Sequence, residues 1–336
     1  MRKRSHGQFI QVVVREITNL LQPSRNGLLS MSTVSALLHR QYRAFFRHDE
    51  WNIGIVNQPI SAFFKPDLEA EVDWLPTVGE GKYLADPFGI MRDKKLYVFC
   101  EEFNYRTYKG KIVCIEVDSS NHPSTPQVVI ELPFHVSYPF LVERAGEIYC
   151  IPEMSQAKEV SIFRAEQFPH KWVKEATLIN DFCAYDSTVF EYGGRWWLIC
   201  TSGHHNRDLF VWYADDLFGP WQQHAGNPVK RDLQSSRPGG TPFMHEGDLY
   251  RPAQDCRKTY GGQLVLNKIL TLTPTEFNET IAATITPWTS NYSYGIHTIS
   301  AVGKVTIVDS KQIKFIRSAC RNAVARDLDQ LRPSIT

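Results

Sequence analysis

The sequence lacks the features that mark several common classes of protein. Its 336 residues contain no apolar run as long as the roughly eighteen residues that a membrane-spanning helix needs. The N-terminus has no continuous apolar stretch ahead of a small-residue cleavage site, so we expect no secretory signal and a cytoplasmic location. No predicted strand interleaves basic and aromatic residues in the pattern that binds nucleic acid, so no nucleic-acid partner is predicted.

Cysteine is sparse and follows no ligand pattern. The chain has seven cysteines, an odd number, and no CxxC pair. Cys100, Cys150 and Cys200 fall in equivalent predicted strands. This favours small buried apolar side chains over disulfides or zinc ligands, and no metal site is predicted from them.

The chain as a whole has almost no excess charge, since its net charge is +1, but the charge is unevenly placed. Residues 1–48 hold eight Lys or Arg against one acid, Glu16, which gives this segment +7 and leaves −6 for the remainder. A basic arm thus precedes a mildly acidic body. We expect the arm either to dock on that body or to make peripheral contact with an anionic membrane, where each basic residue adds about 1 kcal/mol.

The periodicity of the apolar residues divides the chain into three parts. Helical spacing recurs over 9–21 and again over 34–46, whereas strand-like alternation begins at Trp51 and continues to about Phe315. We therefore predict an amphipathic helical arm over residues 1–50, an all-β body over 51–318, and a C-terminal helix and tail over 319–336.

The body contains a repeat of about fifty residues. Five times, a strand-like segment is followed 11 residues later by an aromatic or β-branched residue in a second strand, and the first members recur at intervals of 52, 48, 53 and 56 residues. The anchor pairs are Asp86/Tyr97, Tyr138/Tyr149, Asp186/Trp197, Gly239/Tyr250 and Gly295/Thr306. Charged or Gly-containing turns within the pairs indicate β-hairpins. The repeat predicts a five-bladed β-propeller, in which the strand starting at Trp51 completes a last blade formed otherwise by 295–300, 305–309 and 313–317.

Equivalent positions of propeller blades converge on one axis, so two sets of residues are expected to meet there. The first set is the anchors, and the second lies four residues beyond each second-strand anchor. The candidates from these sets are four catalytic carboxylates, Asp86, Asp186, Glu101 and Glu153, and two substrate contacts, Tyr138 and Gln254. Four crowded carboxylates would raise some pKa values and separate an acid from a base. Structural roles remain open, because Asp86 and Asp186 could each serve a local turn and either Glu could face away from the axis.

Three further residues are candidates for substrate contacts. Arg237 lies two residues before the blade-four anchor, where it would suit an anionic group or a carboxylate partner. His297 lies two residues after the blade-five anchor, although an isolated His is more often a core residue. Asp255 follows Gln254 at the end of its strand.

Several segments resemble known propeller families. ADPFG at 85–89, YDSTVF at 185–190 and YADDLFGPW at 213–221 resemble the blade motifs of glycoside hydrolase family 43. WNIG at 51–54, LYRPAQD at 249–255 and GIHTIS at 295–300 resemble the N-terminal propeller domain of plant glucosamine inositolphosphorylceramide transferases and its bacterial relatives. The likeness covers roughly residues 51–310.

The hydrolase resemblance implies particular roles. An Asp on blade one is the general base there, an Asp on blade three tunes pKa values, and a Glu on blade four is the general acid. Asp86 and Asp186 match the first two, but the blade-four segment SRPGGTPF at 236–243 has no carboxylate. The acid would have to be Glu153, Glu101 or Asp255, or be missing. A blade-five His helps to hold a central ion in some relatives, so an ion near His297 is an expectation; no other cofactor is predicted.

These observations lead to three functional hypotheses. The first is a carbohydrate-active enzyme that cleaves or transfers a glycosyl unit in intracellular glycan or glycolipid metabolism, with a sugar or glycolipid as its substrate. The second is a glycosyltransferase at the membrane that uses a phosphate-activated donor, with Arg237 neutralising the leaving group. The third is a propeller that only binds sugar or protein, which explains the acidic axial residues poorly.

Overall fold

The computed structural model describes residues 47–65, 68, 70–203, 207–288 and 291–315. The predicted helices of the N-terminal arm and of the C-terminal tail lie outside these residues, as does nearly all of the segment expected to contact a membrane. Within the described residues there is no α-helix; the only helical elements there are the 3-10 turns η1 (Ile60–Phe64) and η2 (Ser155–Ala157). Across the same residues we find no helical segment with the length and hydropathy of a bilayer crossing.

Two compact units are distinguished along the chain. One comprises residues 50–104 and 108–312, which include all strand residues of the blades except 47–49 and 313–315. The other comprises residues 1–49, 105–107 and 313–336.

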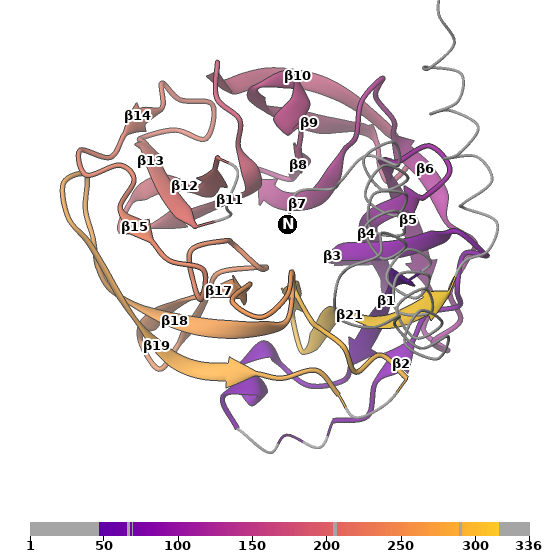
Figure 1. Ribbon diagram of the computed structural model, residues 1–336. Coiled ribbons are helices and arrows are strands. Elements are labelled where there is room, and N and C mark those ends of the chain that lie inside the picture. The colour runs from indigo at the N-terminus through magenta and orange to yellow at the C-terminus, as the bar shows by residue number, and fades with distance from the viewer. Residues whose placement is uncertain (1–46, 66–67, 69, 204–206, 289–290, 316–336) are drawn as a thin grey trace, which may run out of the picture. The chain divides into compact units, whose positions relative to one another are not determined.

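In the part of the chain that the structure describes, twenty-one strands form five antiparallel sheets around a common centre (Figure 1). Blade one is β3 (Lys82–Arg92), β4 (Lys95–Asn104), β5 (Lys109–Val117) and β6 (Gln127–Ile130). Blade two is β7 (Ser137–Arg144), β8 (Glu147–Glu153), β9 (Glu159–Gln167) and β10 (Lys171–Asn180). Blade three is β11 (Tyr185–Tyr192), β12 (Arg195–Ser202), β13 (Asp208–Ala214) and β14 (Gln222–Gln223), with β15 (Lys230–Arg231) also paired to β13. Blade four is β16 (Phe243–His245), β17 (Asp248–Asp255), β18 (Gln263–Leu272) and β19 (Phe277–Ile285). The predicted five-bladed propeller is confirmed.

The fifth blade joins the two ends of the propeller. Its strand order is β2 (Asp73–Trp74), β1 (Arg47–Val56), β21 (Val305–Phe315) and β20 (Ile299–Val302). The strand that contains Trp51 pairs with β21, as predicted, although it begins four residues earlier. The expectation of three late strands was wrong, because β21 runs without a break through residues 313–315 and the fourth strand is β2.

The central hairpins explain why the repeat is visible in the sequence. In each of blades one to four, the first two strands are joined by a two-residue turn, and both turn residues have positive φ; the turns are Asp93-Lys94, Ala145-Gly146, Gly193-Gly194 and Glu246-Gly247. This backbone matches the twist of paired strands, so the turns fix the register of each hairpin. The repeat therefore reflects local turn chemistry.

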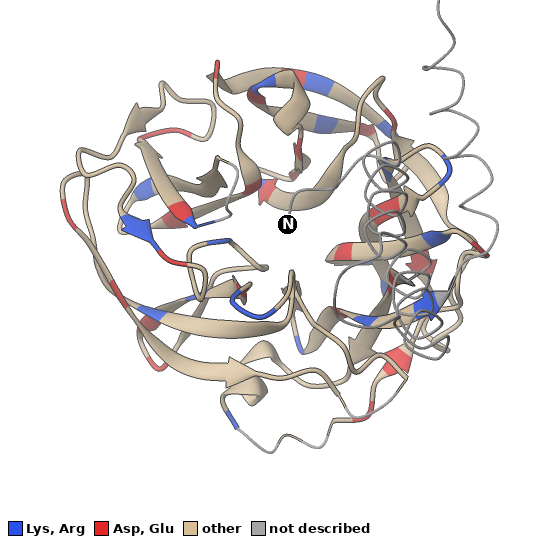
Figure 2. Ribbon diagram, viewed as in Figure 1, with Lys and Arg blue, Asp and Glu red and all other residues tan. Residues whose placement is uncertain are grey.

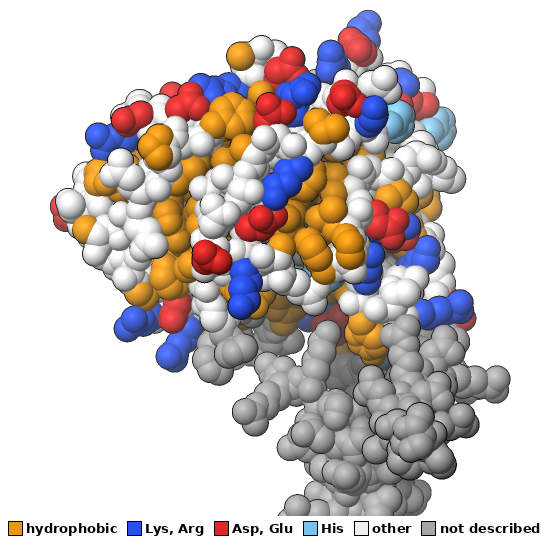
Figure 3. Space-filling view, turned by 90° about the horizontal axis from the view of Figure 1, so that it is seen from above, with side chains coloured by type: hydrophobic (Ala, Val, Ile, Leu, Met, Phe, Trp, Pro, Cys, Tyr) orange, Lys and Arg blue, Asp and Glu red, His pale blue; other side chains and the backbone are white. Residues whose placement is uncertain are grey.

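Hydrophobic layers lie between neighbouring sheets. Cys100, Cys150 and Cys200 are buried in these layers and are free thiols, as predicted. Figure 2 shows acidic and basic segments in every sheet, including acidic segments at strand ends near the centre. In the view of Figure 3, charges of both signs are mixed with scattered hydrophobic side chains.

Candidate functional site

The innermost strands of blades one to three share one backbone irregularity. Asp86, Tyr138 and Asp186 have φ values of 54°, 46° and 54°, and the strand register shifts around each of them. A left-handed conformation is uncommon for residues other than Gly, and for a bulky Tyr it is an outlier. Such strain persists only where the surroundings hold it in place, and it concentrates at functional sites. The predicted anchors are thus a structural feature of the blades.

Asp86 is held by residues of blade five. Its carboxylate Oδ1 accepts a hydrogen bond from the Thr298 hydroxyl at 3.0 Å and lies 3.7 Å from His297 Nε2. No described residue donates to its other oxygen, Oδ2, and the residue is 5 % exposed. Burial raises the pKa of Asp86 to about 6; His297 opposes this rise, and the nearby carboxylates of Asp186 and Asp309 add to it.

Asp309 was not among the predicted site residues, yet it organises this side of the site. Its Oδ1 accepts the backbone N–H groups of His297 and Thr298, at 3.0 and 2.9 Å. Its Oδ2 accepts the backbone N–H of Asp86 at 2.9 Å and lies 2.6 Å from His297 Nδ1. Burial alone would lower the pKa of His297, but Asp309 and Asp86 raise it. The net effect is a raised pKa, so the two carboxylates favour the protonated form of the imidazole.

The sequence prediction placed blade five one residue out of register, which put Asp309 on the opposite strand face from the predicted anchor Thr306. The hairpin pairs Val302 with Val305, so counting from this turn puts Ile296, not Gly295, at the anchor position. The same count puts Lys311, not Ser310, at the position of Glu101 and Glu153. Aligning the five sequence repeats by their hairpin turns, instead of by aromatic residues, would have given the correct register.

Asp186 lies on the opposite side of the site, and both of its carboxylate oxygens accept hydrogen bonds. Arg237 donates to both of its oxygens, with distances of 2.5 Å from Nε to Oδ2 and 3.1 Å from Nη2 to Oδ1. Gln254 Nε2 donates to Oδ2 at 2.8 Å and to the carbonyl of Pro238 at 2.9 Å. A bidentate Arg pair of this kind is strong and geometrically specific. Arg237 and Gln254 therefore fix the orientation of Asp186.

Glu153 connects blade two to this pair. Its Oε2 accepts the backbone N–H of Asp186 at 3.3 Å and lies 3.9 Å from Arg237 Nη2, while Oε1 accepts the hydroxyl of Ser155. Burial raises the pKa of Glu153 well above its usual value, Asp186 adds to the rise, and Arg237 opposes it. Glu153 is therefore a buried carboxyl that favours its protonated form.

Glu101 is a second carboxyl of this kind. Burial raises its pKa well above the usual range, and Asp86 and Glu153 contribute next. Its Oε1 is buried and accepts no hydrogen bond from the described residues. Gly110 makes room for it, since a Cβ there would lie 2.2 Å from Oε1. Both Glu side chains can thus carry the proton that an acid must supply.

Tyr138 and Asp255, which were predicted to contact the substrate, form hydrogen bonds to protein groups outside the carboxylate cluster. Tyr138 is fully buried, and its hydroxyl lies 2.9 Å from the Thr188 hydroxyl and accepts the backbone N–H of Gly240, so it ties three blades together. Asp255 accepts the side-chain Nε–H and Nη2–H groups of Arg257, at 3.0 and 2.8 Å, and lies on the opposite face of β17 from Gln254. The structure brings Asp86, Asp186, Glu101, Glu153, Arg237, Gln254 and His297 into one electrostatic cluster, which Asp255 does not join.

The ligand atoms of Asp86, His297 and Asp309 lie within 4.8 Å of one another, a spacing that could hold a metal ion. Both Asp309 oxygens already accept donors from the protein, and one of those donors is the imidazole nitrogen of His297. A hard cation such as Ca²⁺ needs six to eight free oxygen ligands, and a bound ion would displace these contacts. The donor set therefore fits an ion-paired network better than a metal centre.

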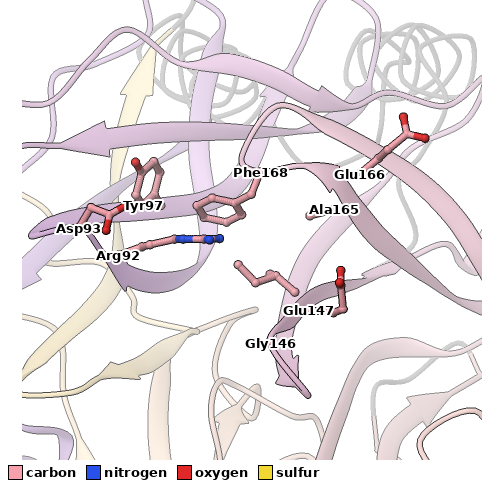
Figure 4. A pocket seen from close by; sticks show the side chains of 9 residues that line it. Arg92, Asp93, Tyr97, Gly146, Glu147, Ala165, Glu166 and Phe168 are labelled. Atoms are coloured by element: carbon pink, nitrogen blue, oxygen red, sulfur yellow. The ribbon is translucent and has the colours of Figure 1, made fainter.

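A separate cavity of about 440 Å³ lies at the other end of the strands, between the turns of blades one and two (Figure 4). There the Arg92 guanidinium lies 5.4 Å from the centre of the Phe168 ring, and Tyr97 meets the same ring edge-on. Arg92 is six residues along β3 from Asp86, which corresponds to about 20 Å. This cavity is distinct from the carboxylate cluster.

The fold and the cluster define a five-bladed propeller with strained axial carboxylates. The family model described as "Glucosamine inositolphosphorylceramide transferase 1, N-terminal" matches residues 76–291. Because this match covers more than half of the sequence, the chain belongs to that family, and the resemblance inferred from the motifs is confirmed.

Individual relatives agree with this assignment. The glucosamine inositolphosphorylceramide transferase 1 of Oryza sativa subsp. japonica is 36 % identical over 214 residues, which cover 61 % of this chain and 29 % of the relative. The Arabidopsis thaliana protein of the same name is 31 % identical over 205 residues, covering 59 % and 27 %. The chain thus matches less than a third of the length of these curated relatives.

Solved structures agree at the level of fold. A glycosyl hydrolase from Bacteroides ovatus superposes with a TM-score of 0.51 at 11 % identity, covering 75 % of this chain and 90 % of that one. At this identity the likeness concerns the fold alone.

Proposed function

We propose that this propeller is a carbohydrate-active enzyme that cleaves or transfers a glycosyl unit, with Asp86 as its general base. The observation that carries the proposal is the state of Asp86: one oxygen is held by Thr298, the other has no described protein donor, and the pKa is raised to about 6. A base works best when its pKa lies near the operating pH. The names of the relatives, which refer to glucosamine and to an inositol-containing glycolipid, support a sugar as the substrate class.

In this reaction Asp86 removes a proton from water or from an acceptor hydroxyl. The oxygen of that nucleophile forms a bond to the anomeric carbon, and the bond from that carbon to the leaving oxygen breaks. Glu153, whose pKa is raised by burial, gives its proton to the leaving oxygen. Asp186 is kept in place by Arg237 and orients the sugar; Glu101 is the alternative acid.

A second candidate is transfer from a phosphate-activated donor. Arg237 stands in the blade-four segment where the resemblance to family 43 leads one to expect an acidic residue. A phosphate leaving group needs neutralisation by a cation and no proton. The relatives' names as transferases favour this candidate, whereas the bidentate pairing of Arg237 with Asp186 favours the first.

Metal binding, membrane contact and cellular location are three further properties of this protein. We infer no resident metal, because the lone pairs of Asp309 are used within the protein. Membrane association through residues 1–48, and a cytoplasmic location, stay proposals. Flotation of the full chain with phosphatidylserine vesicles, compared with phosphatidylcholine vesicles, tests the membrane contact; a chain shortened by 46 residues that still floats would remove the arm from it.

Turnover assays with two kinds of donor test the enzymatic proposal. The purified chain is offered p-nitrophenyl glucosaminide and N-acetylglucosaminide, and separately UDP-N-acetylglucosamine with an inositol phosphate acceptor. Since p-nitrophenol leaves without an acid, Glu153→Gln should retain its turnover while Asp86→Asn abolishes it. Turnover of only the UDP sugar would select the second candidate. Turnover of none, together with sugar binding, would leave a binding propeller.

A further inference from the structure

One aromatic side chain beside the axial cluster remains open to solvent. Tyr260, in the turn between β17 and β18, is 40 % exposed, whereas Arg237, Trp51 and His297 around it are each less than 9 % exposed. Its ring centre lies 5.3 Å from that of His297, nearly perpendicular to it, and 5.1 Å from the guanidinium carbon of Arg237. The ring thus bridges the Asp86 side and the Asp186 side of the cluster.

The backbone of this turn is held firmly in place. Lys311, which is 2 % exposed, donates from Nζ to the Tyr260 carbonyl at 2.7 Å. Gly261 has φ +57°, and a Cβ there would lie 2.7 Å from the Trp51 ring and 2.8 Å from His297. Trp51 is itself stacked on His297, with ring centres 3.8 Å apart. The exposed ring is therefore presented from a tightly packed support.

Arg237 links the position of the ring to the carboxylates. Its guanidinium carbon lies near two tyrosine rings, 5.1 Å from the centre of Tyr260 and 5.8 Å from that of Tyr185, while its nitrogens bind Asp186. A cation over an aromatic ring is attracted to it by the ring quadrupole, so Tyr260 is drawn toward the guanidinium that binds Asp186. A ligand lying on Tyr260 would consequently have a fixed relation to Asp186.

We propose that Tyr260 is a binding platform for the apolar face of a hexosyl ring, and that it positions this ring against the axial carboxylates. Ligand sites combine apolar and aromatic surface with a few convergent polar groups, which is the combination found here. A pyranose offers axial C–H groups to the aromatic face and hydroxyls to the charged cluster. This inference rests on the proposed function, because it assumes that the cluster receives a sugar.

The test measures binding of N-acetylglucosamine and glucosamine by saturation-transfer NMR and calorimetry. Tyr260→Ala should raise the Kd about 3- to 10-fold, the range expected for one aromatic contact. Tyr260→Phe, which keeps the ring, should bind as the wild type does, and Tyr260→Leu should bind as weakly as Tyr260→Ala. The Leu variant serves as the measurement if the Ala variant does not fold.

Phe218→Ala provides a matched control. Phe218 is 38 % exposed and lies 5.7 Å from Arg144, but it packs on Tyr149 in the outer part of blades two and three. Its removal should leave the Kd unchanged. Wild-type binding that Tyr260→Leu leaves intact would overturn the platform and leave the proposed function standing. Absence of any sugar binding by the wild type would overturn both.

Discussion

Asp86 and Asp186 occupy the same position in their blades and have the same φ of 54°, yet their carboxylates differ in almost every other respect. Asp186 accepts donors on both oxygens from Arg237 and Gln254, while Asp86 has only the Thr298 hydroxyl as a described side-chain donor. The repeat therefore supplies equivalent backbone positions, and the neighbouring blades decide the chemistry. One carboxylate is fixed in orientation, and the other keeps an oxygen for a proton.

The largest loss of folding stability should come from removing the ion pair between Asp186 and Arg237. Asp186→Asn leaves the buried Arg237 guanidinium without its carboxylate, which should lower the free energy of unfolding by about 3–5 kcal/mol. Urea unfolding of the variant measures the loss. The double variant Asp186→Asn/Arg237→Met should recover most of this stability; a double variant as unstable as the single one would show that the pair is not the cause.

A somewhat smaller loss of folding stability is expected from a substitution of Asp309, which holds the backbone of Asp86 in place. Asp309→Asn replaces one acceptor oxygen by an N–H₂ group that faces the donors of Asp86 or His297. Leaving those buried donors unsatisfied should cost roughly 2–4 kcal/mol. Thermal and urea unfolding measure this cost, and Asp208→Asn, at a partly exposed carboxylate of blade three, is the control. Equal stability of the two variants would contradict the role given to Asp309.

The pH dependence of turnover and of stability should report on Asp86. As a base with a pKa of about 6, Asp86 should make turnover fall about tenfold per pH unit below 6 and reach a plateau above it. The folded-state pKa is raised, so its contribution to stability is complete below about pH 4 and is lost as the pH rises through about 6. Asp86→Asn should remove that loss, at most about 3 kcal/mol at pH 7. A wild-type profile that is flat between pH 4 and 7 would exclude Asp86 as the base.

The smallest effect is expected from metal ions. The Asp309 oxygens and the His297 Nδ1 atom that could bind a metal already contact groups of the protein. We therefore expect 1 mM Ca²⁺ or EDTA to leave the midpoint of thermal unfolding unchanged. An ion present at a hundredfold excess over its Kd would add about 2.7 kcal/mol, which a thermal scan detects. Stabilisation of the wild type that Asp309→Asn abolishes would establish an ion on the Asp86 side.

Much of this molecule could be predicted from local sequence. The two-residue turns, the strand alternation and the fifty-residue interval each depend on residues that are close in the chain, and together they predicted the five blades and the anchors Asp86 and Asp186. The pairing of the Trp51 strand with the last blade followed from the number of strands available. The predicted repeat was one residue out of register in blade five, because the strands of this blade lack the aromatic anchor residues of the other four.

The sequence by itself thus determined the repeat, the hairpins and the set of acidic residues near the axis. Only the tertiary structure decided which groups meet there, because those contacts join residues far apart in the chain: Thr298 donates to Asp86 across 212 positions, and the Asp86 N–H donates to Asp309 across 223. Short-range patterns carry no information about such partners. The difference between an oriented carboxylate at Asp186 and a proton-accepting one at Asp86 arises when the blades close into a ring.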